Sequence, residues 1–295
     1  MYDFEQLTTA HSIKEAIDLL SKDPLAVPIS GGTDLLIKLR EGKLSGCHLI
    51  SIHGLEELSG ISMDSGGTIH IGPGSVFSLI VNDPLIQKYL PVLGTAADQV
   101  GGPQIRNMGT IGGNICNGVT SADSAPALLT LNAMLTLTGI EGSRQVALEH
   151  FYTGPSKTVR AHHELLTDIT ITPDNYEHFG GHYIKYGKRN AMEISTLGCA
   201  VNVRLSDDSS RIADFRLAFG VAAPTPVRCH ETEKALKNMP VTPSLTETIQ
   251  EFAVREIKPR TSWRASREFR IQIARELSSR TLTQAIQNAG GDIYA

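Results

Sequence analysis

A short run of small polar residues, Ser30-Gly31-Gly32-Thr33-Asp34, is the first place in this sequence where chemistry can occur. It follows the strand-like Ala26-Val27-Pro28-Ile29 and precedes a helix-like run from Leu35 to Arg40. Successive backbone N–H groups between a strand and a helix converge on one ligand, and glycines let that ligand approach closely. The pattern favours a phosphate cradle. An ordinary turn has the same composition, and the G-x-G-x-x-G dinucleotide fingerprint is absent.

A second run of the same kind is Thr110-Ile111-Gly112-Gly113-Asn114, which is followed by Cys116-Asn117-Gly118 and by a segment from Thr120 through Asp123 to Ser124. It is rich in side chains that form hydrogen bonds and poor in titratable groups, which suits binding better than acid–base catalysis. A polar loop closed on itself by Asx and Ser/Thr turns is the alternative. Together, the two runs can hold the two halves of a dinucleotide.

Motifs for hydrolysis and metal ligation are missing from the sequence. There is no G-x-S-x-G elbow and no H-E-x-x-H, and the pair His162-His163 has no cluster of carboxylates beside it. We therefore expect no catalytic residue and no metal ligand in this chain. The four cysteines are too widely spaced for a disulfide framework or a C-x-x-C cluster, so we expect reduced, mostly packed thiols. Redox chemistry would need an organic cofactor.

Two basic segments complete the candidates. Lys185-Tyr186-Gly187-Lys188-Arg189 can place a cation near a bound anion, and a strand end with a solvated charged face is the alternative. Arg260-Thr261-Ser262-Trp263-Arg264 is interpreted as a helix start, with the only tryptophan as an anchor.

The composition bounds the class of protein. The chain has 295 residues, 41% of them hydrophobic and 20% charged, as in a soluble globular protein. A net charge of −4 argues against a nucleic-acid partner. The N-terminus lacks the basic and apolar regions of a secretory signal, and no apolar run approaches the ~18 residues of a membrane span. We expect a cytoplasmic protein with no membrane partner.

The elements that must position these runs begin with an amphipathic helix, because Ser12-Ile13-Lys14-Glu15 has the capping-box pattern ahead of apolar residues at helical spacing. The strand, glycine loop and helix around Gly31 follow, and His48 to Ile52 is a second strand, so the chain opens with a small α/β unit. Shorter strands are expected at 69–72, 135–138 and 144–148. A helix around 85–100 and a long glycine-rich loop over 101–123 lie between the first two of these.

The second half continues with strand-like segments and ends in helices. The strands are expected at 165–171, 182–186, 197–205 and 211–219, and the helices at 245–257 and 265–277. We predict an α+β fold with a domain over 1–175, in subdomains of about 1–58 and 59–175, and a smaller α+β domain over 176–295.

The sequences of these loops resemble the FAD motifs of the FAD-binding medium subunits of the molybdenum hydroxylases. The resemblance extends nearly from end to end, through residues 28–35, 102–107, 110–117, 218–228 and 262–266. It implies a two-part FAD-binding domain of the vanillyl-alcohol oxidase (PCMH) type, followed by the smaller domain. It also implies electron transfer within a complex. In the complex that the resemblance implies, a large partner subunit would hold molybdopterin and a small one two-iron two-sulfur clusters. The flavin would pass a hydride to NAD.

The resemblance also assigns the flavin contacts. The pyrophosphate would be held by the first loop, whose residues are Pro28, Ile29, Ser30, Gly31, Gly32, Thr33, Asp34 and Leu35. The pyrophosphate or the ribityl and ribose groups would contact the second set, Thr110, Ile111, Gly112, Gly113, Asn114 and Asp123. Leu166 and Lys185 would lie at the isoalloxazine end, where Lys185 would tune the flavin. Eukaryotic members have an aromatic residue stacked on the flavin near the position of Val100, and this chain departs from that pattern.

Residues 104–107 and 117–126 resemble the flavin subunits of bacterial xanthine dehydrogenases more than those of carbon monoxide or quinoline enzymes. Subunits that serve another heterocycle, such as nicotinate, remain an alternative, because substrate contacts belong to a different chain. A free-standing FAD oxidase would need its own general base, and none is obvious. A flavin-free scaffold is the third alternative, against which the intact glycines at 31, 32, 112 and 113 argue.

Overall fold

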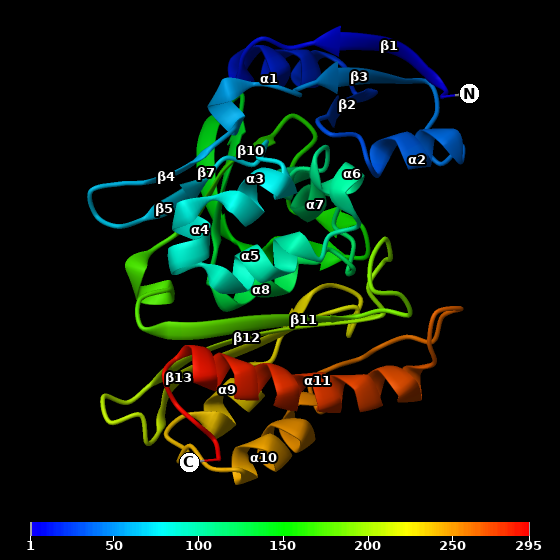
Figure 1. Ribbon diagram of the computed structural model, residues 1–295. Helices are drawn as coiled ribbons and strands as arrows, with labels where there is room; N and C mark the ends of the chain where they lie inside the picture. The colour runs from blue at the N-terminus through cyan, green and yellow to red at the C-terminus, as the bar shows by residue number, and fades with distance from the viewer. Residues whose placement is uncertain (1, 295) are drawn as a thin grey trace.

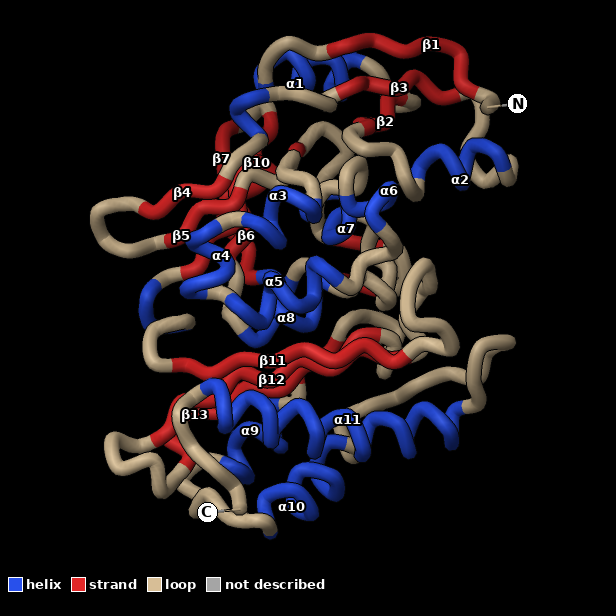
Figure 2. The backbone as a smooth tube through the Cα atoms, viewed as in Figure 1, coloured by secondary structure: helices blue, strands red, loops and turns tan. Residues whose placement is uncertain are grey.

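The protein, for which we describe a computed structural model over residues 2–294, is built from three larger sheets stacked with helices between and outside them (Figures 1 and 2). The first layer is a parallel sheet of three strands in the order β1-β3-β2. Its elements are β1 (Phe4–Thr9), α1 (Ile13–Lys22), β2 (Ala26–Ile29), α2 (Leu35–Arg40) and β3 (Cys47–Ser51). The capping box is confirmed at its first bond, since the Ser12 hydroxyl accepts from the Glu15 N–H at 3.1 Å.

The second layer is an antiparallel sheet of five strands in the order β4-β5-β10-β6-β7. Its strands are β4 (Ile61–Met63), β5 (Ile69–Ile71), β6 (Met134–Gly139), β7 (Gly142–Ala147) and β10 (Leu165–Ile171). After β7 in the chain, β8 (Tyr152–Gly154) and β9 (Lys157–Thr158) form a separate two-stranded ribbon. Single 3₁₀ turns occur at η1 (Glu56–Leu58), η2 (Leu148–His150) and η3 (Pro173–Asn175).

Short helices follow within the middle of the molecule (Figure 1). They are α3 (Phe77–Asn82), α4 (Pro84–Tyr89), α5 (Pro91–Asp98), α6 (Pro103–Arg106), α7 (Ile111–Cys116) and α8 (Ser124–Thr130). Residues from these helices and from the five-stranded sheet form one continuous apolar core, which Tyr183, Ala200 and Ala218 of the third layer join. Two of these helices, α5 and α8, lie against the third layer.

The third layer is an antiparallel sheet in the order β11-β12-β13-β14, with three helices on its outer face (Figure 1). Its elements are β11 (Phe179–Tyr186), β12 (Leu197–Leu205), β13 (Ile212–Gly220), β14 (Val227–Arg228), α9 (His230–Leu236), α10 (Ser244–Ala253) and α11 (Arg267–Asn288). Helices α5 and α8 pack on the inner face and α11 on the outer face. Strand β12 is therefore buried on both sides, and its first seven residues are all buried.

The predicted α+β class is confirmed, and several predicted elements need correction. The chain begins with strand β1 rather than with a helix. The helix expected over 85–100 is two helices, because Pro91 starts α5 where α4 has ended. The expected loop over 101–123 contains α6 and α7. Trp263 anchors nothing, since 79% of its surface is exposed and α11 starts only after Ser266.

The four thiols are free and three of them are buried, as the sequence predicts. The domain boundaries near residues 58 and 175 stay a prediction. Between residues 2 and 294, none of the helices combines the length and hydrophobicity needed to cross a lipid bilayer.

Close packing of α11 on β11 depends on one glycine. A Cβ atom at Gly180 would lie 2.2 Å from the Ala289 amide nitrogen and 2.3 Å from the Ala285 carbonyl oxygen. We predict that Gly180→Ala lowers the free energy of unfolding by about 1–3 kcal/mol, because backbone atoms must move apart. Urea unfolding followed by circular dichroism measures this. The control is Gly154→Ala, whose Cβ would lie 4.0 Å from the nearest side-chain atom. Equal stability of the two variants would contradict the packing.

Candidate cofactor-binding site

The two glycine runs, far apart in sequence, lie against each other in the structure. A Cβ at Gly31 would lie only 1.6 Å from the carbonyl oxygen of Met108, so the two main chains are in direct contact there. A chain of side-chain hydrogen bonds links the same segments. The Asn117 amide donates to the Asp34 carboxylate and accepts from the Lys38 ammonium. The first run is thereby fixed beside the second.

The backbone of the first run has free donors. Gly32 has a φ of +69°, a conformation that favours glycine, and its carbonyl accepts the N–H of Leu36 at 3.0 Å as α2 begins. Across the described part of the chain, no protein acceptor bonds the N–H groups of Gly31, Gly32, Thr33 and Asp34. Unbonded backbone donors in a half-buried loop need water or a ligand. Their number and order suit an oxyanion such as a pyrophosphate.

The second run differs, because its amides are already bonded within the protein. Those of Ile111, Gly112, Gly113 and Asn114 donate to the Ser75 carbonyl, the Pro73 carbonyl, the Thr110 hydroxyl and the Thr110 carbonyl. A Cβ at Gly112 would lie 2.5 Å from the Cβ of Pro73, so this glycine serves close packing. The side-chain amide oxygen of Asn114 also accepts from the Ser124 hydroxyl at 2.7 Å. This run therefore offers a ligand a firm wall and side-chain atoms rather than free backbone donors.

Asp123 and Lys185 form a buried ion pair between the second and third layers. The Lys185 Nζ lies 2.8 Å from the Asp123 Oδ2 and 2.8 Å from the Gln99 carbonyl oxygen, and both it and Asp123 are nearly buried. The other oxygen of Asp123 accepts from the Tyr183 hydroxyl at 3.0 Å and from the Ser195 hydroxyl. Burial raises the pKa of Asp123, while the ammonium of Lys185 and these hydrogen bonds act in the opposite direction.

The remaining predicted contacts lie on the surrounding elements. Pro28 and Ile29 belong to β2, and Leu35 is the first residue of α2. Leu166 lies on β10 with 5% of its surface exposed, inside the main core. Val100, close to the position at which eukaryotic members of the family have an aromatic residue, is 7% exposed and belongs to the same core.

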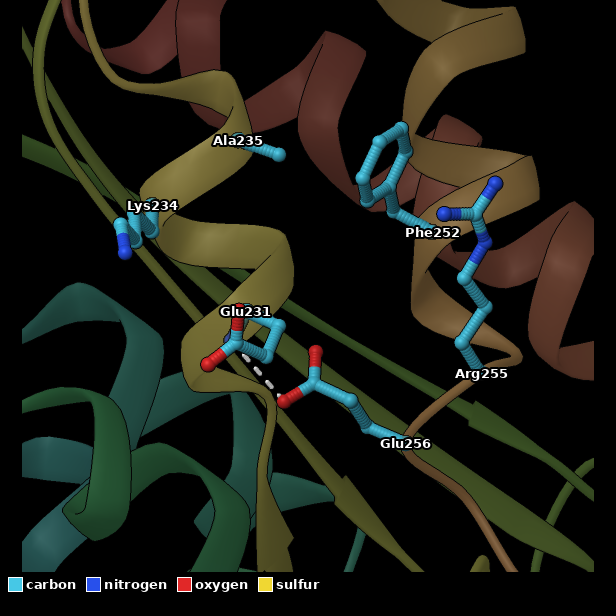
Figure 3. A pocket seen from close by; sticks show the side chains of 6 residues that line it. All are labelled: Glu231, Lys234, Ala235, Phe252, Arg255 and Glu256. Carbon is cyan, nitrogen blue, oxygen red and sulfur yellow. Dashed lines mark hydrogen bonds between the residues drawn. The ribbon is translucent and has the colours of Figure 1, made fainter.

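Two surface hollows lie elsewhere. One is formed by α9, α10 and the turn after α10, on the outer side of the third sheet (Figure 3). There the Glu256 carboxylate accepts from the Glu231 N–H at 2.9 Å, and Arg255 lies over the ring of Phe252. The other lies beside β4 and β5 and includes His70 and Asp168. Neither includes a residue of the glycine runs.

Comparison with known proteins decides the family. Residues 2–173 match the model of the FAD binding domain in molybdopterin dehydrogenase, and residues 182–285 match that of the CO dehydrogenase flavoprotein C-terminal domain. The chain belongs to the FAD-binding medium subunits of the molybdenum hydroxylases.

Relatives of this flavin-subunit family match over most of their length. The putative xanthine dehydrogenase FAD-binding subunit of Escherichia coli (strain K12) is 42% identical over 293 residues, covering 99% of this chain and 100% of the relative. The nicotinate dehydrogenase FAD-subunit of Eubacterium barkeri is 33% identical, covering 86% and 88%. A chain from the carbon monoxide dehydrogenase structure of Hydrogenophaga pseudoflava superimposes with a TM-score of 0.93 at 27% identity, covering 98% and 99%.

Sequence reasoning missed several residues that support this site in the flavin subunit. Gln99, Tyr183 and Ser195 were not singled out, although all three bond to Asp123 or Lys185. Their partners are 60 to 86 residues away, so no local pattern marks them. Lys38 was likewise missed. Its partner Asn117 belongs to the segment Cys116-Asn117-Gly118, which follows the second run and was singled out.

We predict that Asp123→Asn destabilises the flavin subunit by about 3–5 kcal/mol, because the Lys185 side chain would be left in a buried site without its counter-ion. Chemical unfolding measures the change. Glu276→Gln is the matched control, since Glu276 forms an ion pair with Arg280 at an exposed position and should contribute less than about 1 kcal/mol. A small effect at both positions would show that the Asp123–Lys185 pair does not hold the layers together.

Proposed function

We propose that this chain binds FAD and transfers electrons within a xanthine dehydrogenase-type molybdenum hydroxylase. The observation that carries the proposal is the row of four unbonded N–H groups from Gly31 to Asp34, held against the second glycine run. Such a row binds the oxygens of a pyrophosphate without a side chain in the way. Family membership makes FAD the dinucleotide that this row would receive.

The residues of the chain bind and orient this cofactor. In this proposal the pyrophosphate lies on the amides of residues 31–34, with Pro28 to Leu35 around it. Thr110 to Asn114 form the facing wall, and the side-chain NH2 of Asn114, which donates to no acceptor among residues 2–294, would donate to a hydroxyl of the cofactor. Lys185, already fixed by Gln99 and Asp123, holds a positive charge at the end assigned to the isoalloxazine. Leu166 would supply apolar contact at that end.

Bound FAD would let this chain take up single electrons from iron–sulfur clusters and release two of them, together with a proton, as a hydride. The chain's own contributions are binding, orientation and electrostatics. We propose that residues 1–175 hold the cofactor, as subdomains 1–58 and 59–175. Residues 176–295 close the site through Tyr183, Lys185 and Ser195.

The partners follow from the same proposal. A large subunit carries molybdopterin and hydroxylates the substrate, a small subunit carries two-iron two-sulfur clusters, and NAD takes the hydride. Xanthine is favoured over another heterocycle because the relative named for xanthine dehydrogenase is 42% identical and the one named for nicotinate dehydrogenase is 33% identical. The nicotinate relative supports hydroxylation of another heterocycle as the second candidate.

We predict that Gly32→Val empties the cofactor site. Its side chain would enter a left-handed backbone position and press on Leu36 and Ile29, 3.2 and 3.3 Å from the new Cβ, which distorts the row of amides. The ratio of FAD to protein, from the visible spectrum of the purified chain and the cofactor released on denaturation, should fall at least about tenfold.

Gly42→Val is the matched control for this variant. Gly42 has a φ of +67° and no atom within 4 Å of its Cβ position, so the backbone strain is the same and the loop is left intact. The control should keep its FAD. Full FAD in the Gly32 variant would contradict the cradle, and a colourless wild-type chain that refuses added FAD would favour a scaffold role.

A further inference from the structure

Arg270, near the start of α11, carries a charge that no ion pair among residues 2–294 neutralises. Only 2% of its surface is exposed. Its guanidinium donates to the Thr196 carbonyl and, at 2.9 Å, to the Ser262 hydroxyl, and both of these acceptors are neutral. Among the residues that the structure describes, neither its Nε nor the buried hydroxyl of Thr196 has a hydrogen-bond partner. A buried guanidinium normally has a carboxylate beside it, because an uncompensated buried charge is strongly destabilising.

The charges that act on Arg270 are also positive. Burial lowers the pKa of Arg270, and the charges of Arg260 and Arg264 lower it further. Of the ion pairs formed between residues 2 and 294, none includes Arg260, Arg264 or Arg270. We call these three residues the arginine cluster. Arg260 is exposed to water, whereas the buried charge of Arg270 would be stabilised by an anion from outside the chain.

Large apolar side chains are exposed next to the arginine cluster. Trp263 is 79% exposed, with the Arg264 guanidinium 4.3 Å from its ring centre. Phe269, one residue before Arg270, is 45% exposed and packs edge-on against Tyr186. Ile194, two residues before Thr196, is 52% exposed. Exposed Trp, Phe and Arg together are the composition of protein interfaces and of their hot spots.

We propose that this face docks a partner subunit, which inserts a carboxylate into the arginine cluster and lays apolar side chains against Trp263 and Phe269. Charge complementarity selects an acidic group, because three guanidiniums without a counter-ion repel one another and any basic partner. The exposed aromatic rings select a protein surface with apolar side chains. The proposal rests on the proposed function for the presence of partner subunits, and it identifies the electron-donating iron–sulfur subunit as the occupant.

The position of the face supports this occupant. Thr196, whose carbonyl bonds Arg270, directly follows Ser195, whose hydroxyl bonds Asp123. Asp123 in turn bonds Lys185, which the proposed function places at the flavin. The loop before Ser195 also reaches the turn between α5 and α6, since the Met192 N–H donates to the Gly101 carbonyl at 3.0 Å. A subunit docked here therefore lies beside the proposed flavin site, where an electron donor has to be.

Two variants test the docking face against the purified iron–sulfur subunit of the complex. Arg264→Glu reverses one charge of the arginine cluster, and Trp263→Ala removes an exposed side chain that packs into no core. Each should raise the Kd at least about tenfold. Wild-type binding should weaken as salt is raised, and Arg264→Glu should lose part of that dependence. Arg280→Glu is the control, because it makes the same change at an exposed site in the C-terminal half of α11 and should leave the Kd unchanged.

The FAD content of every variant separates this proposal from the proposed function. Variants that keep their FAD and lose the partner support the docking face. Wild-type affinity in both variants, or an equal loss in Arg280→Glu, would overturn it while leaving the flavin assignment intact.

ADP-ribose is added as a second probe. The docking-face proposal would be overturned in favour of a nucleotide-phosphate site if the wild-type chain binds ADP-ribose tightly and only Arg264→Glu abolishes that binding, while the iron–sulfur subunit still binds the variant. A wild-type chain without FAD would count against the proposed function, and the Kd comparison would still decide the docking face.

Discussion

The main chain at Gly31 lies so close to the Met108 carbonyl that no side chain fits between them, and the arrangement of the site depends on this contact. It joins a loop of the parallel sheet to the segment that leads into α7. Because α7 is itself tied to Pro73 and Ser75 through its own amides, the first loop rests on a fixed support. A loop held in this way keeps four N–H groups together without bonding them. That combination of rigidity and unused donors is what a tight anion site requires.

The third layer completes the site through electrostatics rather than through apolar packing alone. Lys185 and Asp123 face each other across the boundary between two layers, and each has further partners that fix its orientation. Removing either charge would leave the other buried, so the pair makes the attachment of β11 specific. One residue beyond Ser195, the chain meets Arg270, where the opposite situation holds and a charge has no partner. The flavin subunit thus satisfies its charges where its own layers meet and leaves them unsatisfied where we propose that another subunit binds.

Local patterns predicted the elements that local forces determine. The cap at Ser12 and the order of strand, glycine loop and helix around Gly31 follow from residues within one or two turns of each other. Strand β1 was missed because Phe4–Thr9 is mostly polar, with no buried residue to give an apolar alternation. Helix α7 was predicted to be loop because its two glycines disfavour a helix. Hydrogen bonds from its amides to the Pro73 and Ser75 carbonyls nonetheless stabilise this helix. The network around Asp123 joins residues 60 to 72 positions apart, for which short-range spacing carries no signal.

The unused amides of the first loop are the centre of this account, and hydrogen exchange measures them directly. Exchange of the amides from Gly31 to Asp34 should be fast in the cofactor-free chain and should slow clearly when FAD is added, because each N–H then donates to the pyrophosphate. The amides of Ile111 to Asn114, already bonded within the protein, should change less. Bound FAD with no added protection at residues 31–34 would contradict the assignment of this loop as the cradle.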